Sequence, residues 1–454
     1  MARIVIYVYP AVSHCNSTFA VAKELRSRGH EIVYSGVEEL RRDATAQGYE
    51  FLSAELAPSG NPLRGDRMQR LTFLGRLGEF RRNRRAAALA LQSLARCDTF
   101  DPLVASARAD AFLVDANYSN EALSLIKHHV PFAIFSTKIC LDRSPGLPPI
   151  TSGVVPNTSS ASKFRAWWAW ERFLTKRRAL QFMHSTGLGA GDAMRRAADN
   201  GRFPLSAISL NRSIAIGIRT APEFILAPAE FDFPRPLAPN QQYVGPYVDL
   251  QRSDSSLDFG YAGRMARFKQ ERTAGKPLVY CSLGTLPWQY RDADRFLGRL
   301  LQACRGARWN TVFALGRELA AYWRARTSEN VVVFDRVPQL DVLRNCDLMI
   351  THGGMNSIKE CILMGVPMLV FPGTADLDQE GNGARVIYHR LGLRGKMRSA
   401  DSFEIRRKIE LILTEPVYRD RVADLRRRVM ASDAYRKGAE IVEDALWGLH
   451  LPIG

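Results

Sequence analysis

Short apolar runs alternate with helical repeats of apolar positions along the chain. In the first half, such runs occupy residues 4–8, 31–35, 111–114 and 130–135. Between the first two, Phe19, Ala22 and Leu25 recur at helical spacing, and Gly29 is placed to end the helix. A strand, a helix and a second strand in this order form a βαβ unit, which predicts a parallel, doubly wound sheet.

A second series of the same kind begins beyond the middle of the chain. Apolar runs at 278–282, 330–334 and 348–350 predict further buried strands. A proline-rich stretch, 233–246, separates the two series, and proline stiffens a connection and discourages helix or sheet across it. The sequence therefore predicts an α/β protein. We expect an N-terminal domain over 1–235, a C-terminal domain over 236–420 and a terminal helical segment over 421–454.

The segment 351–360, Thr-His-Gly-Gly-Met-Asn-Ser-Ile-Lys-Glu, contains the most informative chemistry. It follows a predicted strand and opens a helix that is expected to end at Gly365. Free backbone N–H groups and the helix dipole make such a junction an anion-binding site. The alternative is an ordinary glycine turn in which Asn356 or Ser357 is the N-cap.

The neighbouring residues add a family resemblance. Val337-Pro338-Gln339 lies upstream of the glycine turn, and residues 365–372 and the pair Asp378-Gln379 lie downstream. This order closely resembles the donor-site signature of family 1 glycosyltransferases, the UDP-glycosyltransferases of the GT-B fold, including the bacterial natural-product enzymes. The resemblance is strongest over 330–390.

The resemblance implies a fold and a division of labour. Two Rossmann-like domains would face a cleft, the first binding the acceptor and the second the nucleotide-sugar, with the final helix crossing back to the first. UDP-sugar or dTDP-sugar would be the co-substrate, without a metal or other cofactor. The residues implied in nucleotide-sugar binding are Ser282, Gly284, Thr285, Val337, Gln339, His352, Gly354, Asn356, Ser357, Glu360, Asp378 and Gln379.

The residue that contacts the sugar and the identity of the nucleotide base both remain open. Asp376 competes with Asp378 for the contact with sugar hydroxyls, because the spacing from Pro372 is longer than usual for the family. Asp376 and Asp378 also spell the Asp-x-Asp metal motif of a different glycosyltransferase fold, which we discount inside this signature. The acidic residue and Gln379 favour an intact hexose such as glucose. Arg336 stands where plant members carry a stacking Trp, so uracil and thymine both remain open.

A general base is expected at the end of the first strand. In an open α/β sheet the functional crevice lies at the carboxyl ends of the strands, and His14 follows the first strand while Asp115 ends another. A carboxylate bound to one imidazole nitrogen fixes the tautomer and stabilises the imidazolium. Alone, His14 would more often be a loop histidine and Asp115 a helix cap, but the resemblance favours both as a catalytic pair. Asn117 and Glu121 are fallbacks.

Composition narrows the class. The chain has 454 residues, 46% apolar content and a net charge of +17, with arginine far outnumbering lysine. It lacks an apolar run long enough to span a bilayer and a signal-peptide core, so we expect a cytoplasmic protein. Seven cysteines include no Cys-x-x-Cys pair, which argues against a zinc or redox motif.

The segment 163–178 is basic and aromatic. Phe164, Trp167, Trp168 and Trp170 lie among lysines and arginines. We favour a core or acceptor-pocket role for these aromatics, with weak peripheral membrane contact as the alternative.

Other functional classes fit less well. A nicotinamide-dependent oxidoreductase needs Gly-x-Gly-x-x-Gly after the first strand, and residues 9–15 contain no glycine. A sugar-nucleotide 2-epimerase shares the fold but does not require the His14–Asp115 pair. A nucleic-acid-binding protein would fit the charge, but no nucleic-acid motif is present. A catalytically silent relative would most simply have lost the base or the phosphate donors.

Overall fold

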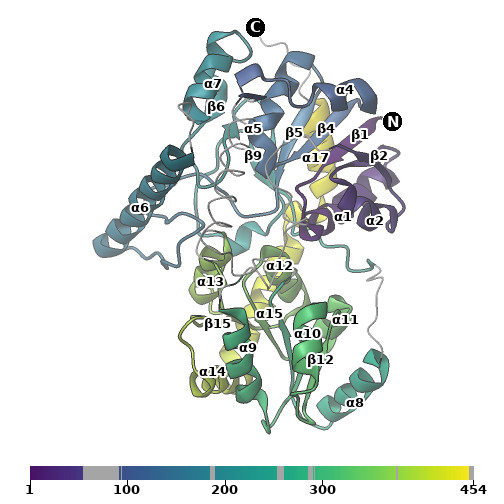
Figure 1. Ribbon diagram of the computed structural model, residues 1–454, viewed down its shortest axis with the longest axis vertical. Coiled ribbons are helices and arrows are strands. Elements are labelled where there is room, and N and C mark those ends of the chain that lie inside the picture. The colour runs from purple at the N-terminus through teal and green to yellow at the C-terminus, as the bar shows by residue number, and fades with distance from the viewer. Residues whose placement is uncertain are drawn as a thin grey trace, which may run out of the picture.

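The computed structural model describes residues 1–54, 92–93, 95–184, 190–252, 260–284, 290, 292–374 and 377–448. Two parallel sheets, each covered by helices, form the two lobes seen in Figure 1. Among the described residues, no helix has the length and apolar character that crossing a bilayer requires.

The first sheet has the strand order β3-β2-β1-β4-β5-β8-β9, and every pairing is parallel. The strands are β1 (Arg3–Tyr7), β2 (Glu31–Gly36), β3 (Glu50–Ser53), β4 (Ala111–Asp115), β5 (Phe132–Ser136), β8 (Glu223–Ile225) and β9 (Gln241–Tyr243). The order reverses between β1 and β4, which places a topological switch point at the carboxyl ends of these two strands.

Alternate residues of β1 point into two different cores. Ile4 and Ile6 pack with α1 (Val12–Ser27) and α17 (Gly438–Trp447), whereas Val5 and Tyr7 pack with the helices on the other face. Those helices are α4 (Asp101–Ala107), α5 (Ser119–Ala122) and α7 (Ala190–Asp199). Burial on both faces explains why the strands have continuous apolar sequences instead of alternating ones.

The second sheet has the order β12-β11-β10-β13-β14-β15, again parallel. Its strands are β10 (Leu278–Ser282), β11 (Asn310–Ala314), β12 (Val331–Phe334), β13 (Leu348–Thr351), β14 (Met368–Val370) and β15 (Gly392–Arg394). The helices of this half are α8 (Tyr261–Thr273), α9 (Ala293–Cys304), α10 (Arg317–Arg324), α11 (Gln339–Asn345), α12 (Met355–Met364), α13 (Gln379–Tyr388), α14 (Ser402–Thr414) and α15 (Pro416–Ala431). Strands β10, β12 and β13 and helix α12 confirm the sequence prediction, whereas β11, β14 and β15 were not predicted. Helix α12 ends at Gly365 in the left-handed region (φ 72°).

The proline-rich stretch contributes a strand. Gln241–Tyr243 forms β9, which pairs in parallel with β8 at the edge of the first sheet. The predicted boundary after residue 235 therefore cuts off a strand of the N-terminal sheet. Three residues fit as an edge strand because Pro239 and Pro246 flank the pairing without interrupting it.

The end of the chain returns to the first domain. After α15 and the short α16 (Asp433–Arg436), helix α17 packs Ala439, Val442 and Leu446 into the core beneath α1. The yellow helix beside the first sheet in Figure 1 is α17. The hydroxyl of Tyr247 accepts a hydrogen bond from the backbone N–H of Ala439 (2.9 Å).

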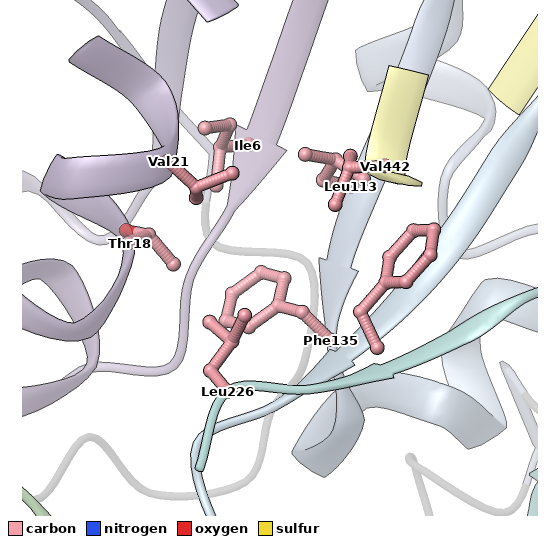
Figure 2. Close-up of a pocket in the computed structure, with 8 residues that line it drawn as sticks. Ile6, Thr18, Val21, Leu113, Phe135, Leu226 and Val442 are labelled. Carbon is pink, nitrogen blue, oxygen red and sulfur yellow. The ribbon is translucent and has the colours of Figure 1, made fainter. Parts of the chain in front are cut away.

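A small apolar cavity lies between α1, α17 and the first sheet (Figure 2). Its volume is about 10 Å³, and Ile6, Val21, Leu113 and Phe135 are among its lining residues. A space of this size is at the lower limit for a single water molecule, and the apolar lining offers water few partners. It is a packing void and not an acceptor pocket.

Candidate active site

His14 and Asp115 meet at the switch point of the first sheet. His14 lies in the first turn of α1, and Asp115 is the last residue of the adjacent strand β4. The Nδ1 atom of His14 is 2.5 Å from Oδ2 of Asp115, and the two side chains are 12% and 1% exposed. The other carboxylate oxygen of Asp115 accepts two hydrogen bonds from Asn117, through its backbone N–H and its side-chain amide (both 2.9 Å).

The surroundings keep Asp115 ionised. Burial raises the pKa of this carboxyl, but the charge and hydrogen bond of His14 outweigh burial and hold the pKa below its usual value. Because Asp115 engages Nδ1, Nε2 is the ring nitrogen that can accept a proton. Of the two fallback residues, Asn117 serves as a hydrogen-bond donor to Asp115. Burial raises the pKa of Glu121 to about 7, and no contact with His14 is found for it in the described structure.

The glycine turn of the second domain encloses His352. A Cβ atom on Gly354 would lie 2.5 Å from Nε2 of this ring, and one on Gly284 would lie 2.6 Å from its Cε1. The ring therefore sits between two backbone segments that only glycine allows. Burial lowers the pKa of His352 to about 4, so the imidazole is neutral at physiological pH. It can donate a hydrogen bond to an anion but does not act as a cation.

Helix α12 starts without a side-chain cap. Its N-cap residue is Gly354 in extended conformation, and no side-chain cap hydrogen bond is found among the described residues. The alternative in which Asn356 or Ser357 caps the helix is therefore wrong, because both residues lie inside its first turn. The uncapped N–H groups match the anion-binding geometry expected of this junction.

Three residues expected to bind the nucleotide-sugar also lie close together. The side-chain amide of Gln339, at the start of α11, donates to Oε2 of Glu360 on α12 (2.7 Å), and Gln339 accepts from the hydroxyl of Tyr280 (3.0 Å). Val337 lies in the loop that leads into α11. A further partner, which was not predicted, is Arg252, whose Nη1 pairs with Oε1 of Glu360 at 2.7 Å. The carboxylate is thus fixed by one neutral and one charged donor.

The turn after β10 lies beside the His352 turn. Ser282 ends β10 and pairs in register with Thr351 at the end of β13. Its hydroxyl accepts from the backbone N–H of Gly284 (3.4 Å). Thr285 lies outside the described residues. Ser282 and His352 therefore stand at one edge of the second sheet, where the carboxyl ends of its parallel strands meet.

Comparisons with known proteins point to glycosyltransferases. Residues 320–446 match the family described as Erythromycin biosynthesis protein CIII-like, C-terminal domain. The chain is 24% identical over 452 residues to 4′-demethylrebeccamycin synthase of Lentzea aerocolonigenes, covering 97% of this chain and 99% of that protein. The crystal structure of the kitacinnamycin glycotransferase shares its fold, with a TM-score of 0.67, 19% identity and 98% coverage of both chains. Together these comparisons support a family 1 glycosyltransferase of the bacterial natural-product type.

A third similar structure contains a bound nucleotide. Glycosyltransferase VinC, whose structure contains dTDP, matches with a TM-score of 0.60 and 17% identity, covering 98% of this chain and 99% of VinC. These structures establish the GT-B fold for the glycosyltransferase described here.

In the present protein, both Asp378 and Gln379 form hydrogen bonds with other residues of the chain. Gln379 accepts from the backbone N–H groups of Gly373 (2.8 Å) and Thr374 (3.2 Å), and its amide donates to the hydroxyl of Tyr290 (3.2 Å). Asp378 accepts from Asn382 (2.9 Å). Gln379 is 4% exposed, so it holds the loop in place, and Asp378 is the more accessible of the two. Asp376 lies outside the described residues.

Helix α6 (Ser160–His184) separates its aromatic residues. Trp170 is 2% exposed and donates from its indole to the carbonyl of Leu147 (2.9 Å), whereas Phe164, Trp167 and Trp168 are 62%, 46% and 52% exposed. The expected core or pocket role is confirmed for Trp170 only. The other three are exposed and share one face of the helix, because Trp167 and Trp168 follow Phe164 by three and four residues.

Sequence reasoning missed several contacts at the domain interface. Asn356 donates to the backbone carbonyl of Ser13 (2.6 Å) and accepts from the hydroxyl of Ser17 (2.5 Å). Lys359 is 1% exposed, although lysine is rarely buried without a charged partner. Its position between Ile358 and Cys361 on an apolar helix was the one signal in the sequence. Asn356, expected to bind the nucleotide-sugar, thus contacts the first domain in this structure.

Proposed function

We propose that the protein transfers a hexose, with glucose as the first candidate, from a nucleoside-diphosphate sugar to a hydroxyl group of a small hydrophobic natural product. The configuration at the anomeric carbon is inverted, and no metal takes part. The nucleotide is UDP or dTDP. The name of the kitacinnamycin enzyme supports the acceptor class, and the dTDP in VinC supports the nucleotide class.

One observation carries the proposal. The His14–Asp115 pair and the uncapped N-terminus of α12 face each other across the domain interface, where Asn356 reaches the carbonyl of Ser13 at 2.6 Å. A base and an anion site that come from different domains and meet at one interface are what transfer from a diphosphate donor to a second substrate requires.

The chemistry follows from these positions. Nε2 of His14 takes the proton of the acceptor hydroxyl while the hydroxyl oxygen forms a bond to the anomeric carbon. The bond from that carbon to the β-phosphate oxygen breaks, and the electron pair leaves with the nucleoside diphosphate. Asp115 stabilises the imidazolium, because its carboxylate remains ionised. A single displacement of this kind inverts the configuration.

The departing diphosphate gains charge, which fixed donors can stabilise. The backbone N–H groups at the start of α12, the neutral His352 and the hydroxyls of Ser282 and Ser357 are suited to this, and they replace a metal in the proposal. Loss of one such donor typically lowers the rate by about 10²–10³.

Calorimetric titration of UDP, dTDP and their glucose conjugates in EDTA tests the donor site without knowledge of the acceptor. We expect one diphosphate to bind in the micromolar range, at about −8 kcal/mol. The variant Glu360→Gln should bind it at least 10-fold more weakly, while Glu410→Gln, on an exposed position of α14, should match the wild type. If no nucleotide binds, the proposal fails and a catalytically silent role replaces it.

A further inference from the structure

Lys359 places an ammonium group at the interface between the two domains. It belongs to α12 of the second domain, is 1% exposed, and has no carboxylate within 4.0 Å among the described residues. Its Nζ atom donates to the carbonyl of Leu226 (3.1 Å) and to the hydroxyl of Ser17 (3.4 Å). Both of these partners belong to the first domain.

Asn356, one turn earlier on α12, contacts the same part of the first domain. Its amide nitrogen donates to the carbonyl of Ser13, and its amide oxygen accepts from the hydroxyl of Ser17. The Ser17 hydroxyl can thus accept from Lys359 while it donates to Asn356. We call the set Ser13, Ser17, Asn356 and Lys359 the interdomain clamp.

The clamp holds the turn of α1 that contains His14. Ser13 directly precedes His14, and Ser17 follows it by one turn on the same helix. The other half of the clamp belongs to α12, whose N-terminus forms the proposed diphosphate site. A shift of either helix along the interface would change the distance between the base and the leaving group. Displacements of about 1 Å in an active site can cost 10²-fold in rate.

Stability does not account for a lysine at this position. A buried ammonium group without a carboxylate partner is unfavourable, and burial lowers the pKa of Lys359 to about 8. The charge of Glu360 raises this pKa and the charge of Arg252 lowers it, so the two effects oppose each other. A methionine would fill the same space without a desolvation cost.

We propose that Lys359 is a positioning residue that, together with Asn356, fixes His14 relative to the diphosphate site. The inference rests on the proposed function. Lys359 itself need not touch the substrates, since its hydrogen bonds go to Ser17 and Leu226.

The test compares Lys359→Met and Ser17→Ala with Lys408→Met, a lysine on α14 far from the interface. Donor turnover is followed as release of UDP or dTDP from its glucose conjugate, with water as acceptor. For Lys359→Met we expect kcat to fall 10- to 100-fold, the donor KM to stay within 3-fold, and the melting temperature not to fall. Ser17→Ala should lower kcat in the same direction, and Lys408→Met should match the wild type.

Hydrogen exchange gives a second measurement that needs no turnover. Backbone amides of residues 12–18 should exchange at least 10-fold faster in Lys359→Met, whereas exchange in Lys408→Met should not change. Unchanged kcat in Lys359→Met, or unchanged exchange where the wild type shows no turnover, would overturn the inference. If wild-type protein binds no nucleotide, the proposed function fails instead, and exchange alone then decides whether the clamp orders α1.

Discussion

At the scale of single residues, the site depends on how each ionisable group is surrounded. Asp115 is buried yet ionised because His14 and Asn117 contact it, whereas His352 is neutral because burial lowers its pKa to about 4. The proposed base therefore has a charged partner, and the proposed phosphate ligand remains a neutral donor.

The variant Asp115→Asn isolates the contribution of the carboxylate. It removes the charge that stabilises the imidazolium and can hold His14 in the wrong tautomer, so we expect donor turnover to fall by about 10²–10⁴. Nucleotide affinity should not change, because Asp115 lies in the other domain. Calorimetry and diphosphate release measure the two effects. Asp199→Asn, at an exposed helix end, is the control, and equal activity of both variants would argue against the pair.

Lys359→Met should stabilise the fold at neutral pH. A pKa lowered from 10.5 to about 8 means that burial favours the neutral form by about 3 kcal/mol. Below pH 8 the lysine is charged in both states, so the full cost of burying the charge lowers the stability of the wild type. Between pH 8 and 10.5 only the unfolded chain holds the proton, so the free energy of unfolding rises with pH. We expect the variant to gain about 1–3 kcal/mol at pH 7, because its lost hydrogen bonds offset part of the gain.

Denaturant unfolding of wild type and Lys359→Met at several pH values measures this difference. The gap between them should shrink as the pH rises from 8 toward 10. A constant gap across this range would show that the ammonium is not the cause.

At the scale of elements, the close approach of two backbone segments holds the two domains in position relative to each other. A Cβ on Gly381, near the start of α13, would lie 2.0 Å from the carbonyl oxygen of Ile150 in the first domain. The neighbouring buried ion pair of Arg385 and Asp232 (2.6 Å) also joins the two domains. Helix α13 is thus fixed against the first domain through contacts that are separate from the interdomain clamp.

Gly381→Ala should therefore disturb the interface, whereas Gly263→Ala should not. A Cβ at Gly263, inside α8, meets nothing within 4 Å, so alanine there should stabilise the protein by about 0.5–1 kcal/mol through helix propensity. Alanine at Gly381 should lower stability by about 1–3 kcal/mol through overpacking. Thermal unfolding compares the two, and a similar gain at both positions would contradict the close contact.

At the scale of the whole molecule, charge and exposed aromatic residues suggest a surface partner. The net charge is +17, and the solvent side of α6 carries Phe164, Trp167 and Trp168 with Lys163 and Arg165 beside them. Figure 1 shows α6 at the outer edge of the molecule. An aromatic face with basic flanks suits the interface of an anionic bilayer.

We expect weak co-sedimentation with phosphatidylserine-containing vesicles at low salt. The triple change Phe164→Ser, Trp167→Ser and Trp168→Ser should reduce the bound fraction at least 5-fold, and Phe403→Ser, an exposed aromatic on α14, should leave it unchanged. Absence of binding at low salt would remove the membrane contact and leave the face for a protein or acceptor.

The sequence by itself determined the fold class, the strands β1, β2, β4, β5, β10, β12 and β13, and the helix that follows the glycine turn. Buried parallel strands need continuous apolar runs, and a helix N-terminus at an anion site needs glycine and small polar residues. Short segments of the sequence are therefore enough to predict both features. The edge strand β9 was not predicted, because three residues between prolines are too few to show the periodicity of a strand.

Only the tertiary structure decided which residues meet across the interface. Asn356 with Ser13, Arg252 with Glu360 and Lys359 with Leu226 are pairs separated by more than a hundred residues. Helical periodicity likewise gives α6 an aromatic face, but it cannot say whether another element covers that face. Local sequence sets the conformation of the backbone and the side on which a residue points, whereas its partner depends on how distant surfaces pack.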